Sequence, residues 1–187
     1  MKGSIKARAT WEALERPGGD TCRLIAEPDG WMLVGHAWFR QPGCDARLDY
    51  VVRCDRDWLS QSADVTGTVS GETVGWRLCR DAEGWMLNDV PVANTAGCHD
   101  VDLGFTPATN LLPVRRLGLQ DGVAHRVDAI WLRVPEGRAE VLRQSYERVD
   151  HRNILYRSPG YETRLELHPS GFVTLYPEGW QGDVDAG

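Results

Sequence analysis

The fold class is decided by residues 47–54, which read Arg47-Leu48-Asp49-Tyr50-Val51-Val52-Arg53-Cys54. Apolar side chains stand at every second position of this stretch, from Leu48 to Cys54. In an extended chain, side chains two residues apart point to the same side and form one apolar face. This period of two predicts a strand with one buried and one solvated face.

Other segments carry the same signal, and they cover residues 65–69, 125–134, 161–167 and 171–176. They are bounded by turn sequences that are rich in Pro, Gly, Asp and Ser. These turn sequences are Arg16-Pro17-Gly18-Gly19-Asp20, Pro28-Asp29-Gly30, Gln41-Pro42-Gly43, Ser158-Pro159-Gly160 and Pro169-Ser170-Gly171. Because most strand candidates follow one another without a helix between them, the sequence favours an antiparallel, mainly β architecture.

A short pattern recurs three times along the chain. In each copy, Arg-Leu is followed after five residues by Gly and an aromatic residue, which is Trp31, Trp85 or Phe172. Glycine readily takes the positive φ that a tight turn requires. An aromatic residue after the turn is typical of a returning strand. Each copy therefore predicts a β-hairpin.

Two segments have helical patterns. At residues 106–112, Thr106 suits the N-cap and Pro107 the first helical position, and Pro113 then breaks or kinks the helix. The second segment, 138–149, has a helical apolar stripe but also reads as a strand. Local pattern leaves this choice open.

The composition is typical of one globular domain. The chain has 187 residues, of which 42% are hydrophobic and 26% charged, and its formal net charge is −6. We expect a single domain over 1–187, with 182–187 as a disordered tail. The acidic charge argues against nucleic acid as a main partner. Apolar runs are too short for a transmembrane segment and no secretory signal is seen, so the expected location is cytoplasmic.

The densest polar cluster supplies the candidate ligand-binding residues, which are Asp100, Asp102, Thr106, Asn110, Arg115 and Arg116. On a strand, Asp100 and Asp102 point to the same side. Two such carboxylates serve as an acid–base pair, bind a cation or accept hydrogen bonds from sugar hydroxyls. Alternatively, they pair with Arg115 or Arg116 inside the protein. Metal-ligand, nucleotide and hydrolase motifs are missing, so we predict no metal, cofactor or assigned catalytic residue.

Tryptophan is unusually frequent, with eight Trp against three Phe. The candidates for a ligand wall are Trp31, Trp85, Trp131 and Trp180. Their rings can stack on sugar faces or line an acyl-chain cavity. Core packing is the alternative, and it is the more common role of large apolar side chains.

The polar cluster belongs to two nearby stretches of sequence. Residues 97–103 read Gly97-Cys98-His99-Asp100-Val101-Asp102-Leu103, and residues 106–117 read Thr106-Pro107-Ala108-Thr109-Asn110-Leu111-Leu112-Pro113-Val114-Arg115-Arg116-Leu117. Together they resemble the signature of the putative glycolipid-binding family, a bacterial domain of unknown function. The resemblance implies a spiral β-roll, in which a long antiparallel sheet wraps around one helix. This fold is distantly like the half-barrels of lipoprotein carriers. The resemblance also places the helix at 107–117 and makes 138–149 a strand.

The resulting hypothesis is a non-catalytic protein that binds a glycolipid or another amphipathic lipid, with a role in glycolipid metabolism. The lipid tails would lie on the concave apolar face, and the polar cluster would meet the headgroup. Two alternatives remain. One is an enzyme that acts on a glycolipid with Asp100 and Asp102 as acid and base. The other is a structural protein that acts as a homodimer.

Overall fold

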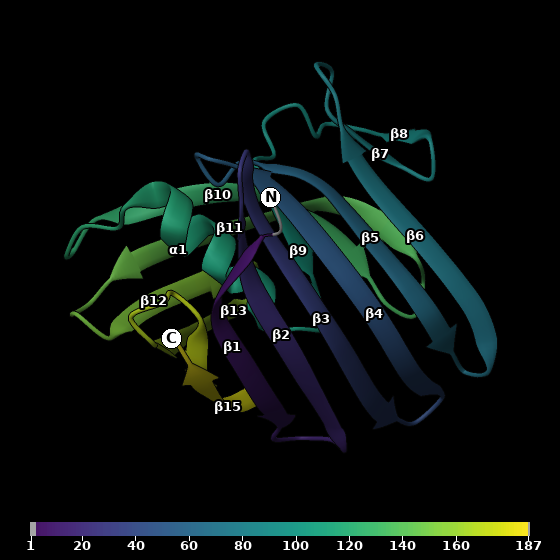
Figure 1. The fold of residues 1–187 in the computed structure, drawn as a ribbon, viewed down its shortest axis with the longest axis horizontal. Helices are drawn as coiled ribbons and strands as arrows, with labels where there is room; N and C mark the ends of the chain where they lie inside the picture. Colours follow the sequence, from purple (N-terminus) through teal and green to yellow (C-terminus); the bar gives the residue numbers. More distant parts are fainter. Residues whose placement is uncertain (1–2, 187) are drawn as a thin grey trace.

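The computed structural model describes residues 3–186, and most of these lie in strands (Figure 1). The N-terminal strands are β1 (Ser4–Ala13), β2 (Gly18–Glu27), β3 (Gly30–Gln41), β4 (Cys44–Asp55), β5 (Ser60–Val69), β6 (Glu72–Arg80), β7 (Trp85–Leu87) and β8 (Val90–Val92). The later strands are β9 (Asp100–Leu103), β10 (Ala124–Arg133), β11 (Arg138–Arg148), β12 (Asn153–Ser158), β13 (Tyr161–Leu167), β14 (Val173–Tyr176) and β15 (Trp180–Asp185). A 3-10 turn, η1 (Ala108–Asn110), and a helix, α1 (Leu111–Leu117), lie between β9 and β10.

The strands of the described chain form one open sheet in the order β8-β7-β6-β5-β4-β3-β2-β1-β15-β14-β13-β12-β11-β10-β9. Neighbouring strands are antiparallel, apart from the parallel pair of β9 and β10. Strand β1 pairs with both β2 and β15, so it joins the two halves of the sheet. The sheet curls around α1, with the N-terminal strands on one side and the green C-terminal strands on the other (Figure 1). The mainly β, rolled-sheet fold predicted above is therefore confirmed.

Strand β4 contains the stretch that decided the fold class. Its Leu48, Tyr50 and Val52 side chains are at most 1% exposed, whereas the residues between them face outward or are partly exposed. The three predicted hairpins are also present, as β2–β3, β6–β7 and β13–β14. Gly171 has a φ of 96°, which a residue with a Cβ adopts only at a cost.

The segment that fitted helix and strand equally well is strand β11. It pairs with β10 along ten residue pairs, from Ala124↔Glu147 to Arg133↔Arg138. These cross-strand hydrogen bonds satisfy backbone groups that an isolated helix would satisfy internally, so tertiary pairing decides the structure. The strand implied by the family resemblance is confirmed.

The predicted helical segment begins as the 3-10 turn η1, with Pro107 as its N-cap and not as its first residue, and the α-helix follows from Leu111. The Thr106 hydroxyl accepts a hydrogen bond of 3.0 Å from the backbone N–H of Ala108, which satisfies one free donor of the first turn. Pro113 lies in the first turn of α1, where a missing N–H costs no helical hydrogen bond, so it does not end the helix. Gly118 ends the helix in the left-handed conformation at φ 53°.

Two apolar clusters fill the roll on either side of the helix. Leu111 and Leu112 pack with the N-terminal half of the sheet, and Val114 packs with the C-terminal half. Phe105 and Phe172 are at most 2% exposed and belong to the first cluster. The concave face of the N-terminal strands is thus occupied by the protein's own side chains.

The expectation of a disordered tail over 182–187 is wrong for residues 182–185. They belong to β15 and pair with β1, from Trp11↔Gly182 to Arg8↔Asp185. Val184 packs on the first apolar cluster. A polar composition suggested a free end, but the open edge of β1 supplies backbone partners for this segment. Residue 187 lies outside the described residues.

Candidate ligand-binding site

Strand β9 carries two of the candidate carboxylates. Its register with β10 pairs Asp100 with Ala129 and Asp102 with Trp131. Because alternate residues share a face, both Asp side chains point to the face of the sheet that covers α1. The two carboxylates share this face, as predicted, but they have different partners.

Asp100 forms an ion pair with Arg116 of the helix. Nη2 of Arg116 lies 2.6 Å from Oδ2 of Asp100, and its Nε donates to both carboxylate oxygens at 3.1 and 3.2 Å. The Asp100 side chain is 1% exposed and that of Arg116 is 16% exposed. Burial raises the pKa of Asp100, while the Arg116 guanidinium acts in the opposite direction. The pair fastens α1 to the end strand of the sheet.

Asp102 begins a hydrogen-bonded chain of neutral side chains. Nε2 of Gln144 donates to Asp102 Oδ2 at 2.5 Å, the hydroxyl of Tyr146 donates to Gln144 Oε1 at 3.2 Å, and Nδ2 of Asn110 donates to that hydroxyl at 3.1 Å. Burial raises the pKa of Asp102 to about 6, with the Gln144 hydrogen bond opposing the shift. A pKa of about 6 leaves Asp102 mainly ionised at pH 7.

Asp102 and Asn110, at the two ends of this hydrogen-bonded chain, border an inner pocket of about 660 Å³. Three of the candidate residues line it, namely Asp102, Thr106 and Asn110. Its aromatic wall consists of Trp131, Tyr156, Tyr176 and Trp180. Among residues 3–186, the Asp102 Oδ1 atom has no protein hydrogen-bond partner. The inner pocket therefore combines a free carboxylate oxygen with several aromatic rings, a combination suited to polar groups carried on an apolar body.

Asp20, which the sequence patterns did not single out, is a buried carboxylate in contact with Thr106. Asp20 is 2% exposed and accepts hydrogen bonds from the hydroxyls of Thr106 and Tyr50, the latter at 3.0 Å. Burial raises the pKa of Asp20 to about 6, against these hydrogen bonds. The expected turn over residues 16–20 is corrected, because Gly18 already belongs to β2. The period-two series that continues from Asp20 to Leu24 would have indicated its inward direction.

Arg115 lies apart from the Asp pair. Its guanidinium carbon is 5.0 Å from the ring centre of Trp58 and 6.0 Å from that of Trp31. These two rings are stacked at 4.4 Å. Adjacent helical residues point about 100° apart, which explains why Arg115 and Arg116 reach different partners.

The four candidate Trp residues have three different roles. Trp85 is 1% exposed and belongs to the core. Trp31 stacks on Trp58, while Trp131 and Trp180 line the inner pocket. Core packing therefore holds for Trp85, whereas the ligand wall stays a prediction for Trp131 and Trp180.

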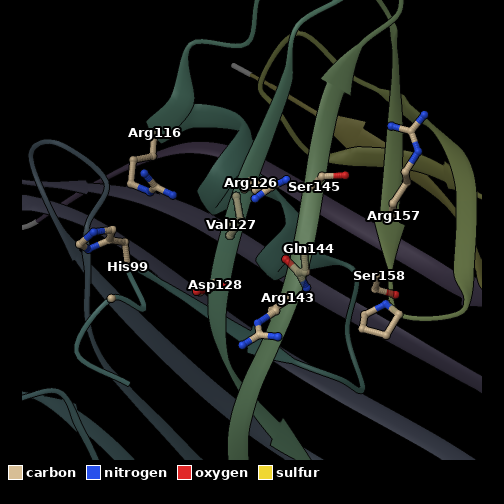
Figure 2. A pocket seen from close by; sticks show the side chains of 12 residues that line it. His99, Arg116, Arg126, Val127, Asp128, Arg143, Gln144, Ser145, Arg157 and Ser158 are labelled. Carbon is tan, nitrogen blue, oxygen red and sulfur yellow. The ribbon is translucent and has the colours of Figure 1, made fainter. Parts of the chain in front are cut away.

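A second pocket, which we call the outer pocket, has a volume of about 560 Å³ (Figure 2). Four arginines from four different elements line it: Arg116, Arg126, Arg143 and Arg157. Of these, only Arg116 was a candidate residue. The other three lie on separate strands, and only strand pairing brings them together. Outward-facing positions of β10 and β11 gave the sequence analysis no reason to select them.

Within residues 3–186, no group of three or more His, Cys, Asp or Glu side chains is arranged to hold an ion. In the same range, no helix has the length and apolar character needed to cross a membrane.

The fold and the inner pocket define a class of protein, an open β-roll with a ligand-sized pocket between its sheet and the segment that leads into its helix. The family model described as "Putative glycolipid-binding" matches residues 8–182, and the chain belongs to this family. The chain is also similar to the crystal structure of a DUF1089 family protein from Pseudomonas aeruginosa, with 28% identity and a TM-score of 0.75. That match covers 88% of this chain and 91% of the other. No curated protein matches the chain.

Proposed function

We propose that the protein binds a glycolipid in the inner pocket and does so without catalysis. The observation that carries this proposal is the pairing of a free carboxylate oxygen on Asp102 with an aromatic wall. Family membership supports the same ligand class. A pocket of about 660 Å³ suits a sugar and the first part of its aglycone, since ligand pockets range from about 300 to 1,000 Å³.

The sugar would occupy the polar end of the pocket. The Asp102 carboxylate would accept hydrogen bonds from sugar hydroxyls, and such charge-assisted bonds are stronger than neutral ones. Trp131 and Trp180 offer apolar ring surface together with polar N–H groups, as sugar recognition requires. Gln144 and Asn110 fix the geometry of this end through the hydrogen-bonded chain to Tyr146.

The lipid tails would leave through an opening beside β11. Only Ser145 to Arg148 of β11 pair with β12, so the preceding part of β11 has β10 as its single neighbour. Val141, Leu142 and Pro159 line the pocket along this stretch. The tails would therefore not lie on the concave face, which packed side chains fill.

The arrangement of the two carboxylates disfavours the enzyme alternative. An acid–base pair needs both groups to reach the substrate. Both oxygens of Asp100 already accept from Arg116, and its side chain is 1% exposed. Asp102 alone is left facing the inner pocket.

The proposal is tested by titrating the protein with octyl glucoside below its micellar concentration. Isothermal calorimetry measures affinity, and native mass spectrometry counts bound molecules. Asp102→Asn removes the charge while keeping the size, and we expect binding to weaken by about tenfold, the ratio that corresponds to losing one charge-assisted hydrogen bond. Asp57→Asn alters an exposed turn carboxylate outside the pocket and serves as the control. Equal affinities in both variants and the wild type would rule the site out.

A further inference from the structure

The outer pocket is organised by one row of residues across three strands. Strand pairing sets Arg126 of β10 opposite Ser145 of β11, and Ser145 opposite Arg157 of β12. Figure 2 shows these three residues on neighbouring strands. Arg143 stands two residues from Ser145 on the same strand and therefore on the same face. Three arginines thus lie beside one serine on this face of the sheet.

Two of these arginines have no acidic partner. Among residues 3–186, neither Arg126 nor Arg143 forms an ion pair, although Asp128 stands opposite Arg143 in the register. Arg157, in contrast, pairs with Glu147 and Glu162. Like charges on one sheet face repel, and Asp128 is the one acidic residue of the pocket lining that lies beside this pair. This local excess is notable in a chain with a net charge of −6.

A histidine at the edge of the outer pocket is held neutral by its surroundings. His99 lines the outer pocket, and its pKa is lowered by burial first and then by Arg80 and Arg116. Nη2 of Arg80 lies 3.0 Å from Nδ1 of His99, so this nitrogen acts as the acceptor of the Arg80 proton. His99 is then a neutral donor through its other ring nitrogen. The pocket offers many donors and a single acidic lining residue, Asp128.

We propose that the outer pocket binds a phosphate group, held by Arg126 and Arg143, with the Ser145 hydroxyl as a further donor. Guanidinium groups match phosphate oxygens in a bidentate geometry. A phosphate has oxygens on all sides and so can meet donors from three strands, whereas a carboxylate presents only two oxygens in one plane. The volume of about 560 Å³ also leaves space for the group that carries the phosphate.

The outer pocket adjoins the inner one at the end of β12. Ser158 and Pro159 line both pockets, at the point where β11 loses its second neighbour. A ligand can therefore place a sugar in the inner pocket and a phosphate in the outer pocket. This extension rests on the proposed function, and it specifies the ligand as a phosphate-bearing glycolipid. The same phosphate chemistry also fits a soluble phosphate ester.

Three probes separate these cases: inorganic phosphate, dihexanoyl phosphatidylinositol and octyl glucoside. The variant Arg126→Gln/Arg143→Gln removes the two unpaired cations from exposed positions. The control Arg47→Gln/Arg138→Gln changes the net charge equally, at two exposed strand arginines outside the pocket that also lack ion pairs within residues 3–186. Calorimetry at low salt measures each affinity, since exposed electrostatic contacts weaken as salt rises.

We expect inorganic phosphate to bind the wild type and the control, and to bind the double variant at least about tenfold more weakly. Octyl glucoside should bind all three proteins equally. Phosphatidylinositol that binds more tightly than either single probe supports a lipid source, whereas phosphatidylinositol that binds no more tightly than phosphate supports a soluble ester. Phosphate affinity that is undetectable, or equal in the variant and the control, overturns the phosphate site. That result does not affect the proposed function of the inner pocket, because octyl glucoside binding tests that function separately.

Discussion

Arg116 of the helix and Asp100 of β9 form the most buried ion pair in the described chain, with Nη2 and Oδ2 2.6 Å apart. The pair connects the central helix to the last strand of the sheet. It also explains why two carboxylates on one strand face behave differently. Asp100 holds the helix to the sheet through Arg116, whereas Asp102 lines the inner pocket.

Removing the cation from this pair should strongly destabilise the protein. Arg116→Gln leaves the Asp100 carboxylate buried without a countercharge, which costs about 3–5 kcal/mol. Urea unfolding followed by fluorescence measures the loss. The double variant Asp100→Asn/Arg116→Gln should recover part of it, since no uncompensated charge remains. Arg115→Gln is the control, because Arg115 is exposed and lies over Trp58. A loss for Arg116→Gln no larger than that for Arg115→Gln contradicts this role.

Stability should respond to the ionisation of Asp20. Its pKa is about 6 in the folded protein, above the ordinary value of 3.8, so the folded state holds its proton more tightly than the unfolded state. The contribution is therefore fully present below pH 4 and is lost as the pH rises through 6. The shift corresponds to about 2–3 kcal/mol.

The measurement is the difference in unfolding free energy between the wild type and Asp20→Asn at pH 4.5, 6 and 7.5. The variant cannot ionise, so the wild type should lose stability relative to it as the pH rises. The difference between the two proteins removes the pH dependence that other groups contribute equally to both, such as Asp150, whose pKa is lowered. A difference that does not change with pH would mean that Asp20 titrates normally.

The hairpin glycine at 171 should be intolerant of a side chain. Gly171 has a φ of 96°, and an added Cβ would also lie 3.1 Å from Cδ of Arg115. We expect Gly171→Ala to destabilise the protein by about 1–3 kcal/mol. Gly75→Ala is the matched control, since nothing lies within 4 Å of its Cβ position and its φ is not positive. Thermal unfolding compares the two, and equal midpoints would show that the turn has no special conformational demand.

Residues 182–187 should be required for stability, although their composition suggests a tail. Truncation after Gln181 removes the pairs from Trp11↔Gly182 to Arg8↔Asp185 and uncovers the edge of β1. Lost ladder hydrogen bonds at about 1 kcal/mol each predict a destabilisation of about 2–4 kcal/mol. Urea unfolding and light scattering test this, because an exposed strand edge also promotes aggregation. A truncated protein as stable and monodisperse as the full chain would show that this pairing is dispensable.

The sequence by itself determined the local structure. Alternation at 47–54, the Gly-aromatic pattern before Trp31 and the Thr106-Pro107 start of the helix all act over a few residues, where steric preference and side-chain direction decide the outcome. The resemblance to a family added what local pattern left open, the strand at 138–149. The local signals predicted an antiparallel, mainly β architecture, and the resemblance implied that the sheet rolls around one helix.

The tertiary structure alone decided which polar residues meet. The register between β10, β11 and β12 placed Arg126 and Arg157 on either side of Ser145, although 31 residues (157 − 126) separate the two arginines in the chain. The roll of the sheet set Asp20 against Thr106, 86 residues later. Such pairs depend on strand register and on the packing of α1. Neither of these produces a periodic pattern in the sequence around the residues that meet. Strand pairing also explains β15, since the acidic end of the chain forms a strand by pairing with the edge of β1.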